Sequence, residues 1–501
     1  YITTPIYYVN DKPHIGHAYT SIACDVLARF KRLDGYSVKF LTGTDEHGQK
    51  VEKAAKSQNK SPLEYANFIS KDFKSLTKTL NLSNDDFIRT TEKRHILAAQ
   101  SLWSKLYENK HIYLDKYAGW YALRDEAFYS EKEIINGKAP SGADVSWVEE
   151  ESYFFDLSKW QDKLLEFYDK NPNFILPKSR MNEVKSFVKG GLRDLSVSRT
   201  SFEWGVKVPN NDKHIMYVWL DALTNYLSAI GYPDTLENEY VNFWPADIHM
   251  VGKDILRFHA VYWPAFLMAA ELPLPKRIFA HGWWTNEGKK ISKSEGNVID
   301  PLEIISSYGL DQIRYFLLRE VPFGSDGDFS KTALLARING DLSNDLGNLC
   351  QRVISMIYKN CNGFIPRKCE KLNDRDIIFY NKSNALYEKV KNEIDKQSFH
   401  EAIKLIWTFI SDANKYVDEQ APWKLRKTDE RRMNDVLWIL ADTIRKIAII
   451  VQPFMPDSSN KILDQLSIDI SERDFSYLDS KHAIKTNKIN SPSPIFPRIE
   501  E

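Results

Sequence analysis

Apolar residues near the start of the chain change from strand-like to helix-like spacing and back again. Residues 1–10 are rich in β-branched and aromatic side chains, and this run stops at the turn-forming segment Asn10-Asp-Lys-Pro13. Apolar positions then recur every three or four residues over residues 15–30, and Gly35 follows them. A second strand-like run covers residues 36–44. This order predicts a strand–helix–strand unit and a parallel sheet, in which ligands bind at the carboxyl ends of the strands.

The middle of the chain interrupts this α/β pattern and then returns to it. Residues 113–211 mix aromatic and charged positions in short runs, which indicates an inserted module. Strand-like and helix-like segments alternate again over residues 212–330. We therefore expect a Rossmann-like α/β domain made of residues 1–112 and 212–330, split by an inserted connective domain.

Residues 331–466 have helical apolar spacing almost throughout. The pattern predicts four long helices with few strand signals between them, at residues 334–358, 374–395, 398–416 and 433–451. This segment is expected to form a C-terminal α-helical bundle. Residues 467–501 show no periodicity and are expected to form an irregular tail.

Composition places the chain among ordinary globular proteins. Of its 501 residues, 43% are hydrophobic and 27% are charged, which excludes disordered, fibrous and membrane classes and fits roughly two to four domains. Its 68 Lys and Arg residues balance 68 Asp and Glu residues. Because nucleic acids respond to local patches, a net charge of zero neither requires nor excludes them as partners. The most apolar stretches, residues 260–270 and 444–451, are shorter than the ~20 residues that span a bilayer, so no membrane partner is expected.

Cysteine usage points to a reducing, cytoplasmic environment. The four cysteines are Cys24, Cys350, Cys361 and Cys369, and none of them forms a Cys-x-x-Cys pair. The sequence therefore predicts neither a disulfide framework nor a structural zinc site.

His14-Ile-Gly-His17 begins the first predicted helix, directly after a strand. Backbone N–H groups and the helix dipole favour an anion at such a terminus, and Gly16 allows a flat ring or a phosphate to come close to the backbone. The two imidazoles add hydrogen-bond donors. Histidines at this spacing also occur as caps or metal ligands, so the tetrapeptide alone leaves its role open.

Lys289-Lys-Ile-Ser-Lys-Ser-Glu-Gly296 lacks helical or strand periodicity and is predicted to be a loop. Its lysines and hydroxyls suit a polyphosphate, although a solvated basic loop would have the same composition. In combination, His-Ile-Gly-His and Lys-Ile-Ser-Lys-Ser resemble the two halves of the ATP site of class I aminoacyl-tRNA synthetases.

The chain resembles the methionyl-tRNA synthetase family along nearly its whole length. The resemblance is carried by Tyr7-Tyr8-Val-Asn10, Gly43-Thr-Asp-Glu-His-Gly48, Tyr217-Val-Trp-Leu-Asp-Ala222, Gly252-Lys-Asp-Ile255, His281-Gly-Trp-Trp-Thr285 and Asp418-Glu-Gln-Ala-Pro-Trp423. Leucine, isoleucine and valine enzymes carry much larger editing insertions than residues 113–211. Cysteinyl enzymes bind their substrate thiol through zinc, and this chain has no comparable ligand set.

The resemblance implies a methionine pocket in the α/β domain. By position, its residues would be Ile6, Tyr8, Trp219, Ala222, Tyr226, Ile255 and His259, with the Asp45 carboxylate pairing the substrate ammonium. Aromatic walls recognise a polarizable thioether, and Tyr8 and His259 could offer hydrogen-bonding atoms near the sulfur. Taken alone, Trp219 and Tyr226 equally fit core aromatics, and His259 fits a core histidine.

The resemblance also implies the ATP contacts. Gly16 would lie under the adenine, Gly252 and Asp254 near the adenosine, and the Trp284 backbone at the base. The catalytic groups would be His14 and His17 at the α-phosphate and Lys290 and Lys293 at the leaving pyrophosphate with Mg²⁺. The implied activity is ATP-dependent formation of methionyl adenylate, followed by transfer of methionine to tRNA(Met) for initiation and elongation.

The resemblance also implies that three residues of the predicted bundle read the CAU anticodon. Asn348 and Arg352 are four residues apart and share a helix face, and Trp423 follows Pro422 at a helix boundary. Amide, guanidinium and indole groups can bind and stack unpaired bases. Without the resemblance, Trp423 would be interpreted as a packing residue and Asn348 as a surface amide.

The chain departs from many relatives in the insertion. Several relatives carry Cys-x-x-Cys zinc knuckles there, whereas this chain has Tyr121-Ala-Leu-Arg-Asp-Glu126. We expect a zinc-free knuckle held by aromatics such as Trp120, Tyr121 and Phe128. The chain continues only briefly past the bundle, so a monomer is expected.

Two other interpretations remain open. The chain could be a different class I synthetase or a small nucleotidyltransferase, both of which use the same two phosphate motifs. It could also be a non-catalytic RNA-binding paralogue, although such a chain is expected to lose phosphate-site residues, and His14, His17 and Lys293 are all present.

Overall fold

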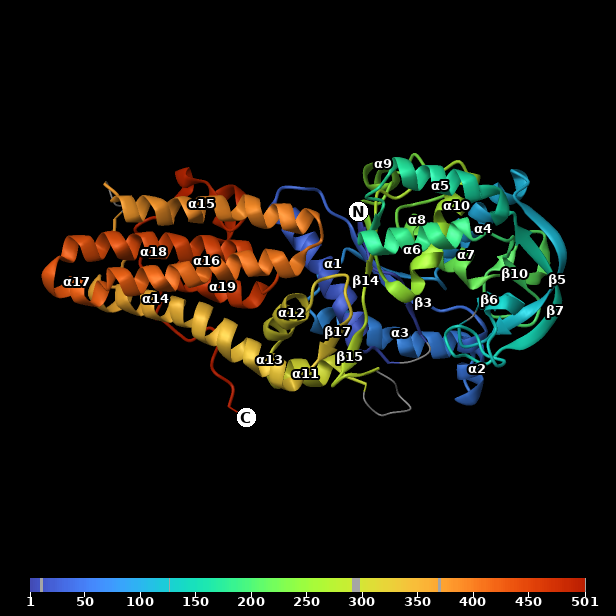
Figure 1. Cartoon of the computed structure of the whole chain (residues 1–501), viewed down its shortest axis with the longest axis horizontal. Coiled ribbons are helices and arrows are strands. Elements are labelled where there is room, and N and C mark those ends of the chain that lie inside the picture. Colours follow the sequence, from blue (N-terminus) through green and yellow to red (C-terminus); the bar gives the residue numbers. More distant parts are fainter. Residues whose placement is uncertain (10–11, 126, 291–297, 368–370, 501) are drawn as a thin grey trace. The chain divides into compact units, whose positions relative to one another are not determined.

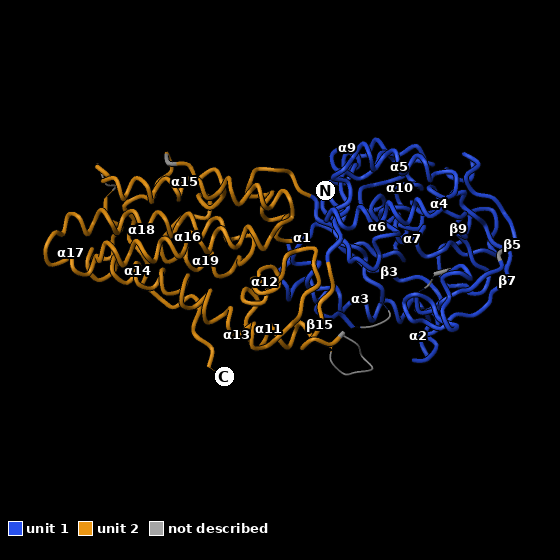
Figure 2. The backbone as a smooth tube through the Cα atoms, viewed as in Figure 1, with its two compact units in different colours: residues 1–24, 39–281 blue, residues 25–38, 282–501 orange. Residues whose placement is uncertain are grey.

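The structure is a computed structural model that describes residues 1–9, 12–125, 127–290, 298–367 and 371–500, without the side chains at 117, 127, 128, 290 and 480 (Figure 1). The chain divides into two compact units. Unit 1 comprises residues 1–24 and 39–281, and unit 2 comprises residues 25–38 and 282–501 (Figure 2). Helix α1 (Ile15–Leu33) begins in unit 1 and ends in unit 2.

A seven-stranded sheet forms the centre of unit 1, and all of its pairings are parallel. Its order is β2-β3-β1-β13-β14-β8, with β4 also paired to β3. The strands are β1 (Ile2–Thr3), β2 (Tyr7–Tyr8), β3 (Phe40–Asp45), β4 (Asp86–Arg89), β8 (Ile175–Leu176), β13 (Ile248–Gly252) and β14 (Ile278–His281). The predicted parallel sheet is confirmed. The first predicted strand divides into β1 and β2 around Pro5, which has no N–H to donate to a ladder.

Strand β1 lies at the point where the chain order of the sheet reverses. Ile2 pairs with Phe40 of β3 on one side and with Ile248 of β13 on the other. In open α/β sheets, ligands bind in the crevice at the carboxyl ends of such strands. His14, Asp45 and Gly252 all follow or end strands at this edge.

Helices and local caps complete unit 1. The helices are α2 (Gln49–Ser57), α3 (Pro62–Thr79), α4 (Lys93–Glu108), α5 (Gln161–Lys170), α6 (Lys178–Lys189), α7 (Val218–Leu223), α8 (Asn225–Ser228), α9 (Asn238–Phe243) and α10 (Trp263–Ala269). Helix α3 shows why such segments begin where they do. Ser61 and Glu64 form a capping box, and Pro62 occupies the first helical position, where its missing N–H has no partner to lose.

The predicted insertion is interleaved with the parallel sheet. Its strands β5 (Ile112–Ala122), β6 (Ala127–Tyr129), β7 (Ser146–Phe155) and β9 (Leu195–Ser196) form an antiparallel sheet in the order β6-β5-β7-β9. However, β8 also lies within residues 113–211 and extends the parallel sheet by pairing with β14. Three further short strands, β10 (Ser198–Arg199), β11 (Lys207–Val208) and β12 (Asn211–Met216), form a separate sheet.

Aromatic and polar contacts hold the knuckle region of the insertion. The Trp120 ring meets Trp147 edge to face at 5.3 Å, and Arg199 lies 5.3 Å from the Tyr121 ring centroid. The side chain of Phe128 lies outside the described part of the chain. Among the described residues, no group of three or more His, Cys, Asp or Glu side chains is arranged to hold a metal ion. The zinc-free knuckle therefore stays a prediction.

Unit 2 contains the helical bundle. The four predicted long helices are confirmed as α13 (Lys331–Arg337) continuing through a π-helical segment (Ile338–Gly347) into α14 (Asn348–Asn360), α15 (Asp374–Asp395), α16 (Phe399–Gln420) and α18 (Glu430–Val451). The short helices α17 (Pro422–Thr428) and α19 (Pro456–Gln465) were not predicted. Cys24, Cys350 and Cys361 are free thiols, and Cys369 lies outside the described residues. Among the described helices, none is both long and apolar enough to cross a bilayer.

Residues before and after the bundle also belong to unit 2. Helices α11 (Pro301–Tyr308) and α12 (Leu310–Arg319) and a three-stranded sheet group with the bundle, although the domain prediction placed residues 282–330 with the catalytic half. That sheet has the order β16-β15-β17, from Lys289–Lys290, Trp284–Asn286 and Gly327–Phe329. The expected tail forms short 3₁₀ turns and packs on unit 2, where Ile489 N–H donates to the Gly363 carbonyl.

Candidate functional site

His14 and His17 share one protonation pattern. The His14 backbone N–H donates to Nδ1 of His17 at 3.0 Å, and the Gly16 N–H donates to Nδ1 of His14 at 3.1 Å. In a neutral imidazole, an Nδ1 that accepts leaves Nε2 to carry the proton. The two rings lie 3.9 Å apart, so two Nε2–H groups lie close together at the start of α1.

Burial keeps both rings neutral. It lowers the pKa of His14, where the Asp254 carboxylate opposes the effect, and it lowers the pKa of His17 well below its usual value, where His14 adds to the effect. The rings are therefore neutral hydrogen-bond donors.

Two glycines bring the backbone close to these groups. A Cβ on Gly16 would lie 2.9 Å from Cε1 of His14, and a Cβ on Gly252 would lie 2.5 Å from an Asp254 carboxylate oxygen. Thr20 extends the arrangement, because its hydroxyl lies 3.1 Å from the Gly16 carbonyl and 2.7 Å from Nε2 of His281. The structure thus brings the predicted residues His14, Gly16, His17, Gly252 and Asp254 to one edge of the sheet.

The predicted methionine pocket is assembled within unit 1. Its residues come from the β1–β2 segment, from α7 and α8, and from the turns after β13. Tyr226 is part of the hydrophobic core, and Ile6, Tyr8, Trp219 and Ile255 pack against that core. Ala222 and His259 are also buried. Trp219 stacks on Phe258 with 3.6 Å between ring centroids.

The hydrogen-bonding atoms of Tyr8 and His259 are engaged by protein partners. The Tyr8 hydroxyl donates to the His47 carbonyl at 3.0 Å. His259 lies in a π-helical segment (Phe258–Tyr262), a feature that often marks functional sites, and its Nδ1 lies 3.0 Å from the Ile255 carbonyl. A carbonyl only accepts, so Nδ1 donates and Nε2 accepts from the Tyr226 hydroxyl at 2.7 Å.

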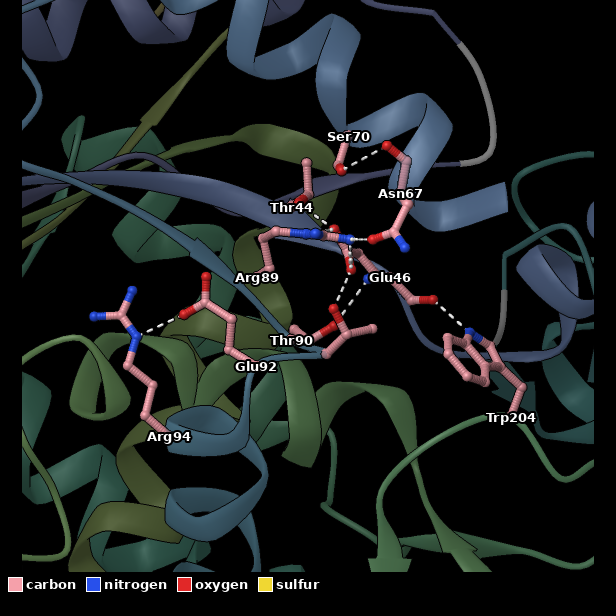
Figure 3. A network of polar contacts seen from close by, with 10 residues as sticks. Thr44, Glu46, Asn67, Ser70, Arg89, Thr90, Glu92, Arg94 and Trp204 are labelled. Atoms are coloured by element: carbon pink, nitrogen blue, oxygen red, sulfur yellow. Dashed lines mark hydrogen bonds and ion pairs between the residues drawn. The ribbon is translucent and has the colours of Figure 1, made fainter. Parts of the chain in front are cut away.

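Asp45 ends β3, and the residue after it is tied into a buried network. The Glu46 carboxylate is fully buried and accepts from Nε and Nη2 of Arg89 at 2.7 and 2.9 Å (Figure 3). The Thr44 and Thr91 hydroxyls donate to the same carboxylate at 2.7 and 2.5 Å. The Trp204 indole donates to the Glu46 carbonyl at 2.6 Å (Figure 3). The turn that carries Asp45 is therefore held through both side chain and backbone.

A second network was not predicted from the sequence. His47 and His95 both contact the Asp221 carboxylate, at 2.7 and 2.6 Å, and Ser228 lies 3.0 Å from His95. Two of its members lie inside motifs that were singled out, because His47 follows Asp45 closely and Asp221 lies between Trp219 and Ala222. The signal available in the sequence was that His47 and Asp221, which can both carry charge, lie next to predicted pocket residues.

The remaining predicted ATP contacts lie in unit 2. Trp284 is in β15, is 6% exposed, and packs against Phe316 with 5.8 Å between ring centroids. Lys290 is in β16, where its backbone pairs with Thr285. Its side chain and the whole of Lys293 lie outside the described residues.

Arg352 and Trp423 come together on unit 2. The Arg352 guanidinium lies 5.4 Å from the Trp423 ring centroid and donates to Asp418 at 2.6 Å. Asn348 is exposed at the start of α14, one turn before Arg352. Trp423 follows Ala421 and Pro422, where the left-handed backbone of Ala421 (φ 44°) ends α16 and Pro422 begins α17. The three side chains provide an amide, a guanidinium and an exposed indole.

The chain matches two protein families in succession. Residues 1–146 and 132–354 match "tRNA synthetases class I (M)", and residues 366–501 match "Anticodon binding domain of methionyl tRNA ligase". The methionine–tRNA ligase of Rickettsia felis is 57% identical over 504 residues, which cover 100% of this chain and 98% of the relative. The Brucella suis enzyme is 52% identical over 506 residues, with the same two coverages.

Solved structures agree with these matches. Mycobacterium tuberculosis methionyl-tRNA synthetase in complex with methionyl-adenylate has a TM-score of 0.97 and 48% identity, covering 99% of each chain. The free form of that enzyme has a TM-score of 0.90 and 46% identity, covering 100% of this chain and 98% of the other. The chain belongs to the class I methionyl-tRNA synthetase family.

Proposed function

We propose that this chain is an ATP-dependent methionine–tRNA ligase. It joins L-methionine and ATP into methionyl adenylate with release of pyrophosphate, and then transfers the methionyl group to the terminal ribose of tRNA(Met) for initiation and elongation. The observation that carries the proposal is the pair of His14 and His17, whose Nε2–H donors start α1 at the switch point of the sheet. The relatives' names and the methionyl-adenylate complex support it.

Holding the two substrates in position supplies much of the rate acceleration of the first step. The methionine carboxylate attacks the α-phosphorus, the bond to the pyrophosphate oxygen breaks, and no covalent bond to the protein forms. Two reactants held side by side react much faster than free ones, and fixed donors stabilise the charge that develops. His14 and His17 donate to the α-phosphate. Lys290 and Lys293 would hold the leaving pyrophosphate together with Mg²⁺, which would offset part of the phosphate charge.

Substrate recognition follows the two halves of the site. Asp45 pairs the methionine ammonium, and the pocket of Ile6, Tyr8, Trp219, Ala222, Tyr226, Ile255 and His259 takes the side chain. Gly16, Gly252 and Asp254 bind the adenosine, with the Trp284 backbone at the base. A polarizable thioether gains dispersion and sulfur–ring contact from such aromatic walls.

Recognition of the tRNA rests on the bundle. Asn348 and Arg352 hydrogen-bond anticodon bases and Trp423 stacks on one of them, which is how proteins read splayed single-stranded loops. The Trp423 side chain is 41% exposed, so part of the ring is accessible to a base, which supports this role.

The domain assignment remains part of the proposal. We infer a catalytic domain from residues 1–112 and 212–330, a zinc-free connective insertion at 113–211, an anticodon-binding domain at 331–466 and a tail at 467–501. We also infer a monomer that acts in the cytoplasm, where tRNA charging occurs. Sedimentation and metal analysis of the purified protein test the monomer and the absence of zinc.

Amino-acid-dependent ATP–pyrophosphate exchange tests the function directly. We expect exchange with L-methionine and background rates with leucine, isoleucine, valine and cysteine. Exchange with another amino acid would identify a different class I synthetase. No exchange with any amino acid would favour the paralogue that only binds RNA.

A further inference from the structure

One buried carboxylate joins the segments that carry the two ends of the proposed methionine site. Asp221 is fully buried on α7, and each of its oxygens faces a different histidine. Oδ2 lies 2.7 Å from Nδ1 of His47, and Oδ1 lies 2.6 Å from Nε2 of His95. His47 belongs to the turn after β3, and His95 belongs to α4. Asp221 therefore connects three elements that are distant in sequence.

The chemistry of this contact is specific. Burial alone would raise the pKa of Asp221, but the charge and hydrogen bond of His47, and then those of His95, outweigh burial and lower the pKa below its usual value. An ionised carboxylate only accepts, so both rings turn an N–H toward it. A buried carboxylate that loses such partners is left as an uncompensated charge, which is strongly destabilising. This cost favours the single arrangement in which both histidines contact Asp221.

The segments that Asp221 connects also contain several residues of the proposed methionine pocket. Trp219 precedes Asp221 by two residues on α7, and Ala222 follows it directly. Asp45 precedes His47 by two residues. The Tyr8 hydroxyl also donates to the His47 carbonyl, so a further pocket wall is fixed to the same turn.

The turn has a separate support that does not reach α7. Glu46 is held by Arg89, which also donates to Asn67 of α3 at 2.6 Å, and by Trp204 through its carbonyl (Figure 3). These contacts attach the turn to β4, α3 and the segment around Trp204. Asp221 is the carboxylate that attaches it to α7.

We propose that Asp221 is a positioning residue of the amino-acid site, which acts through His47 and His95 to set the separation between Asp45 and the pocket walls Trp219 and Ala222. The inference rests on the proposed function, because it concerns how the same site binds methionine. In methionine, a fixed number of bonds separates the ammonium from the thioether. A site that binds both ends must hold its two halves at a matching separation, and a shift of about 1 Å can cost roughly 10²-fold in rate.

Steady-state kinetics of methionine-dependent ATP–pyrophosphate exchange test the proposal. We expect Asp221→Asn and His47→Ala to raise KM for methionine by about 10-fold or more, while KM for ATP changes less than about twofold. His47→Asn keeps an N–H near the position of Nδ1, and His95→Gln keeps one near Nε2. These two conservative variants should have a KM for methionine within about threefold of the wild-type value, because they retain the hydrogen bond to Asp221.

A matched control comes from unit 2. Asp442 is also fully buried and pairs with Arg445 and Lys446 at 2.8 and 3.1 Å. Asp442→Asn should lower the melting temperature and leave KM for methionine unchanged. If Asp221→Asn does not fold, KM for methionine is compared between His47→Ala and His47→Asn instead, which tests the same hydrogen bond.

The outcomes separate the inference from the function on which it rests. If His47→Ala melts earlier but keeps the wild-type KM for methionine, Asp221 is only structural and the inference is wrong. The same conclusion follows if His47→Asn is as defective as His47→Ala. If wild-type protein shows no methionine-dependent exchange, the proposed function fails and the inference falls with it.

Discussion

Two predicted binding regions of this chain differ in how much of their surface the free protein buries. In the methionine pocket, Tyr226 and His259 are 1% and 2% exposed and hydrogen-bond to each other. On the bundle, Trp423 is 41% exposed, and Arg352 pairs with Asp418, whose side chain is 63% exposed. The apolar side chain of a small substrate requires walls that are already in place, whereas bases that swing out of an RNA loop require rings that are still uncovered.

The two regions also differ in how much their polar contacts contribute to stability. Buried polar groups such as His47 and Asp221 are fixed by partners whose loss is costly, so substitutions there should affect binding, chemistry and stability together. An exposed ion pair such as Arg352–Asp418 contributes little to the free energy of unfolding. Substitutions on the bundle should therefore change tRNA charging and leave methionine activation intact.

The largest expected effect is on the chemistry of the buried region. His17→Ala removes one Nε2–H donor from the α-phosphate, and loss of one such donor typically costs roughly 10²–10³ in rate. We expect adenylate formation to slow by that factor with little change in KM for methionine, measured by single-turnover kinetics. His17→Gln offers an N–H at a similar reach and should recover part of the rate. A wild-type rate for His17→Ala would contradict the assignment.

The next effect is a dependence of stability on pH. Burial lowers the pKa of His259 from 6.5 to about 4, against the opposing hydrogen bond to the Ile255 carbonyl. Below pH 6.5 the unfolded chain takes up a proton that the folded chain refuses until about pH 4. The free energy of unfolding should therefore fall as the pH drops across this window, by about 3 kcal/mol from this residue.

The free energy of unfolding of the whole protein, measured with urea at several pH values between 7 and 4, tests this dependence. His259→Gln does not titrate in the window, so its stability should fall less steeply than that of the wild type. Buried histidines whose pKa His259 does not influence, such as His17, contribute equally to both proteins. Equal slopes for wild type and variant would show that His259 is not the group responsible.

A smaller effect is expected on the bundle. Trp423→Ala removes a stacking surface, and base–aromatic stacking contributes about 1–3 kcal/mol per base, or roughly 5- to 150-fold in affinity. We expect kcat/KM for tRNA charging to fall within that range while methionine-dependent exchange stays at the wild-type rate. An equal loss in both assays would indicate a folding defect and would remove the contrast between the two regions.

The smallest effect is expected at the exposed ion pair. Asp418→Ala should change the free energy of unfolding by less than about 1 kcal/mol, because solvent screens the charges and both side chains lose entropy by pairing. Thermal melting measures the change. A loss of several kcal/mol would mean that the bundle face is as tightly organised as the methionine pocket.

Local patterns in the sequence predicted the elements that place the site. Helix α1 begins at Ile15 as its apolar spacing predicts, and the strand before Asp45 is confirmed, starting at Phe40. The resemblance then singled out Tyr226 and His259, whose hydroxyl and Nε2 lie 2.7 Å apart in the structure, and their role in binding stays a prediction. The confirmed elements reflect patterns that are encoded locally.

Tertiary contacts and protonation states could not be predicted in the same way. His47 and Asp221 are 174 residues apart, and no periodicity links them. Strand β8 has two residues, too few for an alternation to be visible, so its pairing with β14 depends on the assembled sheet. The neutral state of His14 and His17 depends on burial that only the fold reveals.

Direct detection of the adenylate tests the central claim most sharply. The protein is mixed with L-methionine, ATP labelled at the α-phosphate and pyrophosphatase, without tRNA, and the protein-bound label is separated and identified. Our account predicts about one equivalent of methionyl adenylate per protein chain, because the first step requires only methionine and ATP held side by side and no contact with tRNA. Absence of the adenylate, or its formation with other amino acids and not with methionine, would contradict the account.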